Sequence, residues 1–436
     1  MSQEKISLFW FRRDLRLQDN AGLYAALSGD YPVQPIFIFD ENILADLEDK
    51  TDARVSFIHQ ELASINDELK SKGTSLAVYH GEPIKIWEKL TKDFSIASVY
   101  TNRDYEPYAT KRDQEVEVLL EKKNIQFHTF KDQVILEPGE VLKKDDTPYL
   151  VYTPFSKMWK KVVEDKDFEQ YSSALYFDNW KSSNYDFPTL KSIGFEPTTI
   201  AIPNKRLTDH TMEVYAEERN FPAKDSTSRL GIHLRFGTVS VREIAARARE
   251  KSDVFYSELI WREFFMMILF YYPHAVTNNF NRKYDAVPWR NKEDEFKKWC
   301  EGKTGYPMVD AGMRELNETG FMHNRVRMIT AGFLTKHLLI DWRWGEAYFA
   351  TKLLDYELAA NNGNWQWAAG TGVDAAPYFR VFNPTEQIKK FDKDKIYQRK
   401  WIKELGTDSY PEPMVEHKMA RERAISTYKN ALSESN

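Results

Sequence analysis

Short apolar runs alternate with longer amphipathic stretches along residues 1–133. The apolar runs have the length and the β-branched and aromatic content that are typical of buried strands. They cover residues 6–11, 33–40, 75–80, 97–101 and 125–129. This pattern predicts five short buried strands.

One amphipathic stretch lies between the second and third predicted strands. Its apolar residues recur at alternating steps of three and four, which places them on one face of a helix. They are Val55, Ile58, Leu62, Ile65 and Leu69. Strand, helix and strand at this spacing predict βαβ units, and therefore an α/β domain with a doubly wound parallel sheet over residues 1–133. The loop after the first strand, RRDLRLQDN, lacks Gly-x-Gly-x-x-Gly, which argues against a dinucleotide bound in the usual Rossmann manner.

The pattern changes after the fifth predicted strand. Residues 134–199 contain prolines scattered among charged and Ser residues, which predicts a long connector between domains. Strand signals then nearly vanish, so residues 200–436 are predicted to form a mostly α-helical domain. Helices are expected over residues 259–272, 306–318, 325–339 and 346–360, with a polar tail that frays after Glu404.

Composition narrows the class of protein. Hydrophobic residues make up 42% and charged residues 29%, values typical of a globular chain. The single cysteine, Cys300, excludes an intrachain disulfide and a Cys-based zinc site, and the nine His do not form a metal-ligand spacing, so no metal is predicted. The N-terminus lacks a basic segment ahead of an apolar run, and the longest apolar run, 264–272, is too short for a bilayer. We therefore expect a protein that is neither exported nor inserted in a membrane.

Aromatic residues are the unusual part of the composition, at 14% of the chain with 12 Trp. In the predicted helical domain several Trp stand beside polar residues, in ELIWREF, DWRW and NNGNWQW. Each ring taken alone fits a hydrophobic core, since aromatic residues dominate core packing. Polar groups beside buried rings need partners, however, and a planar heterocycle with its own donors and acceptors would also satisfy them. Within NNGNWQW, residues 361–367, the Asn and Gly residues predict a turn.

Ordinary catalytic signatures are absent: the chain has no H-E-x-x-H, no G-x-S-x-G and no Walker A loop. Several other motifs, all in one order, resemble the photolyase and cryptochrome family, and most closely its class I DNA photolyases. They are FWFRRDLRLQDN, TSRLG, ELIWREF, EGKTGYPMVDAGMREL, HNRVRMITAGFLTK and NWQWAAGTGVDAAPYFRVFNP. This resemblance covers nearly the whole chain. It implies an N-terminal α/β domain, a C-terminal helical domain and a U-shaped FAD held among the helices.

The resemblance also implies which residues bind FAD. Thr227 and Ser228 fall where the family holds the phosphates and ribose, and small hydroxyls with backbone N–H groups at a helix start suit an anion. Arg327 and Asp355 fall where the family pairs an Arg with an Asp near the flavin ring, although the residues alone also fit a plain buried ion pair. The implied FAD-binding set is Tyr215, Thr227, Ser228, Arg229, Leu230, Gly231, Arg262, Asn324, Arg327, Asp355, Glu357 and Asn361.

Four of the implied positions concern electron transfer. Asn361 falls beside the flavin N5 of similar proteins, although its amide alone also fits a turn. Because an amide cannot release a proton at physiological pH, the reduced anionic flavin is the expected working state. Trp365, Trp342 and Trp289 match the family's chain of three Trp that relays electrons from the surface to the flavin.

Five positions match residues that face the lesion in class I enzymes. Trp261 and Trp367 would stack on a pyrimidine dimer flipped out of the duplex. Glu258 would hydrogen-bond the thymine edge, although it also fits a solvated helix position. Asn324 would contact both adenine and lesion. Proteins that repair the (6-4) photoproduct carry His where this chain has Asn324 and Met328, which argues against that lesion.

Arginines are the candidates for contact with DNA phosphates, namely Arg219, Arg325 and Arg380. The formal net charge of the chain is −5, but residues 380–404 hold eight Lys or Arg against four Asp or Glu. This local surplus fits DNA binding, and it also fits a solvated charged face.

Three features depart from the family pattern. Asn364 stands where class I enzymes usually have a second Gly, and Glu357 stands where Asp is usual. Tyr108 and Ala109 replace the Asn-Glu pair of folate-binding members. The antenna chromophore is therefore left open between methenyltetrahydrofolate, a deazaflavin, a second flavin and none.

The resemblance implies light-dependent repair of cyclobutane pyrimidine dimers in DNA. In the family, photoexcited reduced FAD passes an electron to a flipped-out dimer, the cyclobutane ring splits, and the electron returns. The alternative is a cryptochrome-like blue-light photoreceptor that binds FAD and signals without repair. We expect UV-damaged DNA, single- or double-stranded, as the partner, and a monomer in the bacterial cytoplasm, with the nucleoid.

Overall fold

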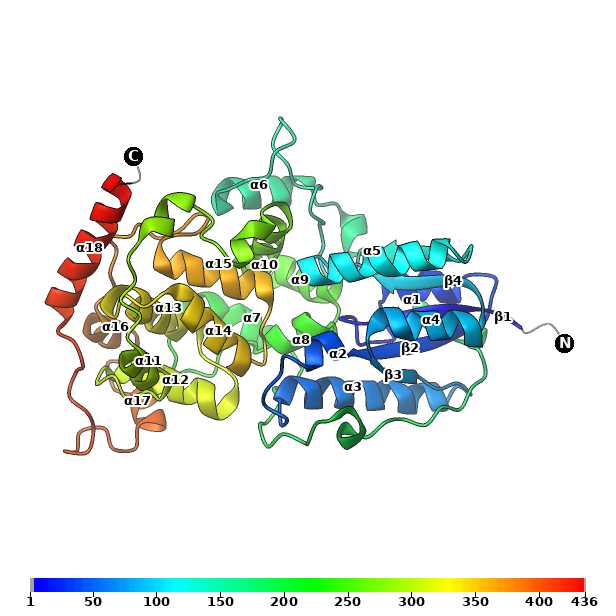
Figure 1. Ribbon diagram of the computed structural model, residues 1–436, viewed down its shortest axis with the longest axis horizontal. Coiled ribbons are helices and arrows are strands. Elements are labelled where there is room, and N and C mark those ends of the chain that lie inside the picture. Colours follow the sequence, from blue (N-terminus) through cyan, green and yellow to red (C-terminus); the bar gives the residue numbers. More distant parts are fainter. Residues whose placement is uncertain (1–3, 435–436) are drawn as a thin grey trace. The chain divides into compact units, whose positions relative to one another are not determined.

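The computed structural model describes residues 4–434, which divide into two compact units (Figure 1). Unit 1 holds the chain up to Glu140 together with Lys161–Arg206 and Arg229–Glu250. Unit 2 holds Val141–Lys160, Leu207–Ser228 and the chain from Lys251 onward. The units interleave along the chain, so the boundaries expected after residues 133 and 199 stay predictions.

Unit 1 is built on a five-stranded parallel sheet with the strand order β3-β2-β1-β4-β5. The strands are β1 (Lys5–Phe11), β2 (Val33–Asp40), β3 (Ala77–Gly81), β4 (Ser95–Asn102) and β5 (Gln126–Phe130). All five match the predicted apolar runs to within two residues. The predicted fold class is thereby confirmed for this unit.

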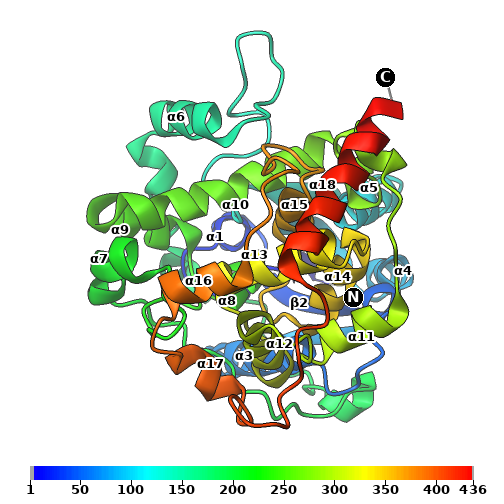
Figure 2. The ribbon, with the colours of Figure 1, turned by 90° about the vertical axis from the view of Figure 1, so that its left-hand side faces the viewer.

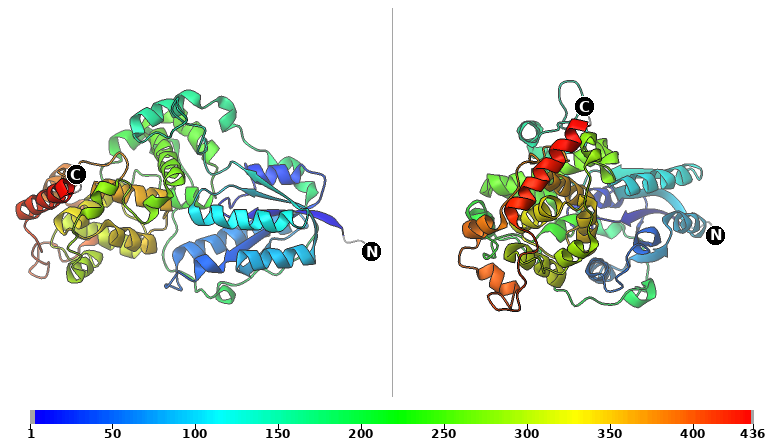
Figure 3. Two further views of the ribbon diagram at one scale, coloured as in Figure 1. Left: turned by 45° about the horizontal axis from the view of Figure 1, so that its top comes forward. Right: turned by 60° about the vertical axis from the view of Figure 1, so that its left-hand side comes forward.

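Side chains alternate between the two faces of the sheet along each strand, and helices cover and bury both faces. On β1, Phe9 and Phe11 pack with residues of α1 (Ala21–Leu27) and α3 (Ala53–Lys70). Leu8 and Trp10 point the other way and pack with residues of α4 (Pro83–Asp93) and α5 (Pro107–Glu121). The predicted helix over residues 55–69 lies within α3. Figure 3 shows the strands running side by side with helices against them.

The segment after β5 contains more helix than a plain connector. The helices between β5 and residue 251 are short: α6 (Tyr152–Val162), η1 (Asp165–Phe168), η2 (Ser173–Asn179), η3 (Leu190–Ile193), α7 (Asp209–Glu218), α8 (Gly231–Phe236) and α9 (Val241–Lys251). One more short helix, α2 (Glu41–Leu44), lies earlier in the chain, directly after β2. Apolar side chains in the second half of the expected connector, such as Trp180 and Phe195, are buried in the core of unit 1.

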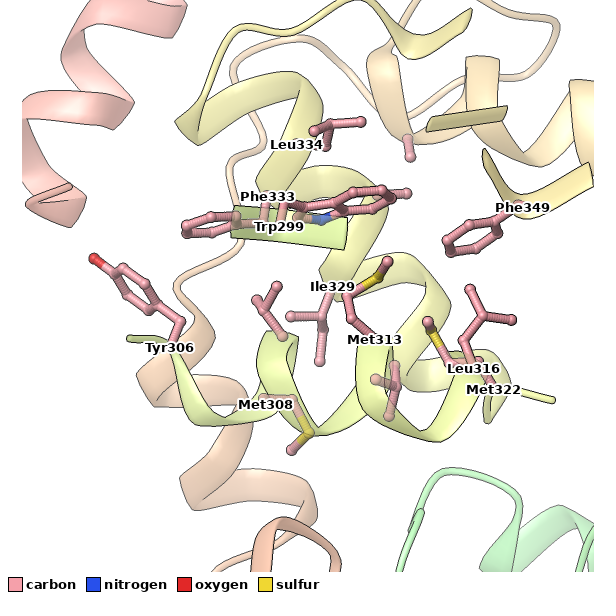
Figure 4. Packing of buried hydrophobic residues seen from close by; sticks show 14 of the residues in the cluster. Trp299, Tyr306, Met308, Met313, Leu316, Met322, Ile329, Phe333, Leu334 and Phe349 are labelled. Atoms are coloured by element: carbon pink, nitrogen blue, oxygen red, sulfur yellow. The ribbon is translucent and has the colours of Figure 1, made fainter. Parts of the chain in front are cut away.

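Unit 2 is helical, as predicted. Its elements after α9 are α10 (Asp253–Tyr271), η4 (Pro273–Val276), η5 (Arg282–Ala286), α11 (Glu293–Cys300), α12 (Pro307–Thr319), α13 (Asn324–Gly332), the π-helix η6 (Phe333–His337), α14 (Trp342–Lys352), α15 (Leu358–Ala369), α16 (Pro384–Phe391), α17 (Ile396–Trp401) and α18 (His417–Glu434). Helix α15 packs against α10, α13 and α14. Figure 4 shows the core beside it, where Trp299, Met313 and Phe349 are buried.

Two predicted helices have different limits. The helix expected over residues 346–360 is broken, because α14 ends at Lys352 and α15 begins at Leu358. The helix expected over residues 325–339 changes to a π-helix after Gly332.

The turn predicted at NNGNWQW is wrong, since residues 361–367 lie inside α15. Tertiary contacts override the poor helix propensity of these residues. A Cβ added at Gly363 would lie 2.2 Å from Phe265 Cδ1, so only glycine lets α10 and α15 approach this closely. The Asn362 amide nitrogen donates to Ala275 O at 3.0 Å, and that of Gln366 donates to the same carbonyl at 2.9 Å.

The fraying tail expected after Glu404 is also wrong, because residues 417–434 form α18 (Figure 2). Ala424, Tyr428 and Ala431 are buried in a small cluster with Val287 and Leu339. Their spacing of four and three is a helical period. Among residues 4–434, no helix has the length and hydropathy needed to cross a bilayer.

Candidate functional site

A pocket of about 100 Å³, open to solvent, lies among α13, α14 and α15 in unit 2. Its wall includes eight of the residues singled out from the sequence. They are Asn324, Arg327, Met328, Asp355, Glu357, Asn361, Trp365 and Trp367. Residues that lie 43 positions apart in the chain therefore share one cavity, because α13 and α15 pack side by side.

One ion pair on the pocket wall joins Arg327 to Asp355. The guanidinium donates to both carboxylate oxygens, at 3.1 and 2.9 Å, and its Nε donates to Met322 O at 2.7 Å. The side chains of Arg327 and Asp355 remain 25% and 22% exposed. A paired guanidinium fixed at its Nε and still open to the cavity is a rigid donor for a ligand.

A second ion pair lies at the start of α15. Arg262 Nη2 is 3.3 Å from Glu357 Oε1, and both side chains are largely buried. Glu357 is the N-cap residue of α15, and its side chain makes no capping hydrogen bond. The Glu357 carboxylate therefore pairs with Arg262 and does not cap the N-terminus of α15.

Asn361 is held by a residue that the sequence did not single out. Its Nδ2 donates to Glu346 Oε1 at 2.8 Å and to Glu346 O at 3.2 Å. Burial raises the pKa of Glu346, and the hydrogen bond from Asn361 opposes that rise. Because the amide nitrogen is occupied, the Asn361 side chain has one fixed orientation in the pocket. The contact is tertiary, between α14 and α15, so no local sequence signal reveals it.

The three Trp proposed as an electron relay differ in exposure. Trp365 and Trp342 are buried at 2% and 0% exposure, and Trp289 is half-buried. A Cβ at Gly345 would lie 2.1 Å from Trp365 Cη2, so the Trp365 ring rests on α14 one turn from Trp342. Two buried rings and one half-buried ring are compatible with a path from the interior of unit 2 to its surface.

The two predicted lesion-stacking rings are placed differently. Trp367 lines the pocket, whereas Trp261 is absent from its wall. Trp261 stacks face to face on Tyr152, with ring centroids 3.6 Å apart and planes 7° apart. Tyr152 is fixed in turn, since its hydroxyl donates to Ser257 O at 2.8 Å and its N–H donates to Asp374 Oδ2 at 3.0 Å. Sequence reasoning missed Tyr152, which lies in the segment read as connector.

Glu258 and Arg219 form an ion pair with each other. Both side chains are about one-third exposed. The residue expected to read the thymine edge and one expected to contact phosphate are therefore neighbours, and DNA binding would have to share or open this pair.

The predicted phosphate contacts lie near one another. Burial lowers the pKa of Arg325, and the positive charges of Arg219 and Arg380 lower it further. Arg325 Nη2 donates to the neutral amide oxygen of Asn220 at 2.5 Å, and its guanidinium lies 4.5 Å from the Phe391 ring centroid. Mutually repelling guanidinium groups are stabilised by an anion, so this cluster fits a phosphate.

The residues expected around the FAD phosphates are divided between the units. Tyr215, on α7, packs edge-on against Phe255 at 5.0 Å, and burial raises the pKa of Tyr215 to about 12. Thr227 and Ser228 belong to unit 2, while Arg229, Leu230 and Gly231 belong to unit 1. Their joint role stays a prediction.

The pocket fits the ring system of FAD by the chemistry of its wall. The Arg327 guanidinium and the amide nitrogen of Asn324 supply donors, and the Asn361 amide oxygen and the carboxylates supply acceptors. Trp365 and Phe349 add flat apolar surface. Among the described residues, no group of three or more His, Cys, Asp or Glu is placed to hold a metal ion.

Comparison with known proteins agrees with this chemistry. A family model described as the FAD binding domain of DNA photolyase matches residues 255–408, and one described as DNA photolyase matches residues 7–172. The deoxyribodipyrimidine photo-lyase of Halobacterium salinarum is 36% identical, with 98% of this chain and 99% of that protein covered.

Solved structures give the same result. A bacterial class III photolyase from Agrobacterium tumefaciens superposes with a TM-score of 0.88 at 33% identity, covering 99% of both chains. An archaeal photolyase from Sulfolobus tokodaii, solved with two FAD molecules, has a TM-score of 0.85 at 36% identity over 97% of this chain and 99% of that one. The chain is therefore a member of the DNA photolyase family, an FAD-binding enzyme of the photo-lyase class.

Proposed function

We propose that this enzyme uses light to repair cyclobutane pyrimidine dimers in DNA. The observation that carries the proposal is the shared wall of the unit 2 pocket. Residues matched to flavin binding, Arg327 and Asn361, face the same cavity as Trp367, which is matched to lesion stacking. Cofactor and lesion would then meet within one site.

The mouth of the pocket supports a flipped-out dimer as the substrate. Trp367 offers an aromatic face on which the flipped-out pyrimidine dimer can stack, and Met328 adds adaptable apolar surface. Asn324 is exposed at the same wall and offers both a donor and an acceptor. Met328 and Asn324 also leave no imidazole at the lesion, which favours the cyclobutane dimer.

DNA binding would rest on the arginines near the pocket. Arg219 and Arg380 each repel Arg325, and phosphates would relieve that repulsion. Glu258, released in part from Arg219, would then turn to the pyrimidine edge.

FAD, when bound in its reduced form, supplies the light-driven electron. The chain's own residues bind, orient and protect: Arg327 and Asp355 hold the ring, Asn361 keeps a carboxamide where a carboxylic acid would supply a proton, and the buried Trp365 excludes water. Trp365, Trp342 and Trp289 would provide a path for electrons from the protein surface to the bound cofactor.

A repair assay tests the proposal. The purified enzyme with reduced FAD is mixed with UV-irradiated oligothymidylate, and thymine absorbance is followed in light and in darkness. Recovery only in the light is the expected result. Absence of recovery, with FAD bound and reduced, would leave the photoreceptor alternative and remove the repair function.

A further inference from the structure

Asn364 is an unexplained side chain on the pocket wall. It lies on α15 three residues after Asn361 and three before Trp367, so the three side chains follow one face of the helix. All three line the pocket. Class I enzymes usually have Gly at this position and would present no side chain there.

The orientation of the Asn364 amide is fixed by its own helix. Nδ2 donates to Ala360 O at 2.7 Å. A carbonyl oxygen can only accept, so the group beside it must be the amide nitrogen, and Oδ1 is left facing away from the helix backbone. At the wall of the pocket, Asn364 therefore offers Oδ1 as its acceptor, beside the second N–H of the amide.

Exposure decides which ligand that acceptor meets. Asn361 and Trp365 are buried at 8% and 2%, whereas Asn364 is exposed, as Asn324 is on the facing helix. Asn364 thus lies at the mouth of the pocket, where a base entering from DNA arrives, rather than at the depth of Asn361.

We propose that Asn364 is a further lesion-contacting residue, whose Oδ1 accepts a hydrogen bond from the N3–H of a pyrimidine in the dimer. This inference rests on the proposed function. Thymine and uracil carry an N3–H, whereas cytosine has an unprotonated acceptor at N3. Asn364 therefore favours dimers of thymine or uracil over dimers that place cytosine at this position.

The test compares the FAD-loaded wild type with Asn364→Ala. Ala is the better helix former, so this variant is expected to fold, and the same change at the exposed helical Asn430 is the matched control. Binding is measured by fluorescence anisotropy with oligonucleotides carrying a thymine dimer, an N3-methylated thymine dimer or no damage. Loss of one hydrogen bond predicts about three- to tenfold weaker binding of the thymine dimer by Asn364→Ala. The Asn430→Ala control should bind as the wild type does.

The methylated dimer assigns the contact. Without an N3–H, the wild type and Asn364→Ala should bind it equally. An equal loss on both dimers would overturn the inference, as would unchanged affinity for the thymine dimer. Loss of FAD from Asn364→Ala on dialysis would place the acceptor on the cofactor instead and would also overturn it. Failure of the proposed function gives a different result, because the wild type would then show no preference for dimer-containing over undamaged DNA.

Discussion

Two polar regions of the molecule use similar side chains for different ends. In unit 1, Asp132 follows β5 and binds both Arg16, in the loop after β1, and Arg242, on α9, at 2.8 Å. These side chains are only 1–10% exposed. In the unit 2 pocket, Arg327 and Asp355 keep almost a quarter of their surface open to the cavity. Charges that satisfy each other in a closed network hold the fold, whereas paired charges that still face a cavity indicate a ligand.

The largest expected effect is a loss of stability when the closed network of unit 1 loses its shared carboxylate, Asp132. Burial raises the pKa of Asp132, but Arg16 and Arg242 outweigh it and hold the pKa below its ordinary value. Asp132→Ala leaves two guanidinium groups buried without their shared partner, so we expect the free energy of unfolding to fall by about 3–5 kcal/mol. Urea unfolding of the FAD-free protein measures this change.

The matched variant in the pocket is Asp355→Ala. Because Arg327 can reach water there, its unfolding free energy should change by about 1 kcal/mol or less in the FAD-free protein. Its FAD content after dialysis should fall, while Asp132→Ala molecules that remain folded keep theirs. If Asp355→Ala destabilised the FAD-free protein as much as Asp132→Ala did, the pocket pair would be structural, and the contrast between the regions would fail.

The sequence predicted the two regions unequally, for physical reasons. The strands and α3 were predictable because the sheet is buried on both faces. Each strand is therefore a continuous apolar run that its own amino-acid composition reveals. The helix through NNGNWQW was not predictable, because its stability comes from Gly363 against Phe265 and from amide bonds to Ala275. Both contacts are tertiary, so the helix propensities of the local residues do not reflect them.

The candidate site shows the same limit. Motif positions assigned Arg327, Asp355 and Asn361 to the flavin and Trp367 to the lesion, and the structure gathers all four in one pocket. The partners that orient site residues escaped detection. Glu346 and Tyr152 act through contacts across 15 and more than 100 residues of chain, which no local pattern encodes.

A smaller effect distinguishes two buried Trp within unit 2. Trp365 and Trp299 lie in one core cluster, with ring centroids 6.0 Å apart. Replacing either by Phe leaves a small cavity, and we expect each change to lower the free energy of unfolding by roughly 1–3 kcal/mol. Only Trp365→Phe should also abolish photoreduction of bound oxidised FAD, followed by flavin absorbance under blue light. Equal loss in both variants would show that core packing, not a specific path, supports photoreduction.

The last effect, about 1 kcal/mol for each pH unit, concerns Lys336, a buried lysine that forms no ion pair with a carboxylate among the described residues. It lies in the π-helix η6, where its Nζ donates to Ala369 O at 2.5 Å and is 4.0 Å from the centre of the Tyr428 ring. Burial lowers the pKa of Lys336 from 10.5 to about 7. Between these values the unfolded chain binds a proton that the folded chain does not, so this residue makes stability fall as pH decreases towards 7.

Lys336→Met removes that dependence while keeping the length of the side chain. The variant's free energy of unfolding, relative to the wild type, should rise by on the order of 1 kcal/mol per pH unit as pH falls from about 10 to about 7. Below about pH 7 the difference should level off, because the lysine is then protonated in both states. Urea unfolding at several pH values measures it, and the exposed Lys298→Met is the control that should show no such trend. A parallel pH profile for Lys336→Met and the wild type would mean that Lys336 keeps its charge through its contacts with Ala369 and Tyr428. Lys336 would then be satisfied by partners inside unit 2, as Asp132 is by Arg16 and Arg242 inside unit 1.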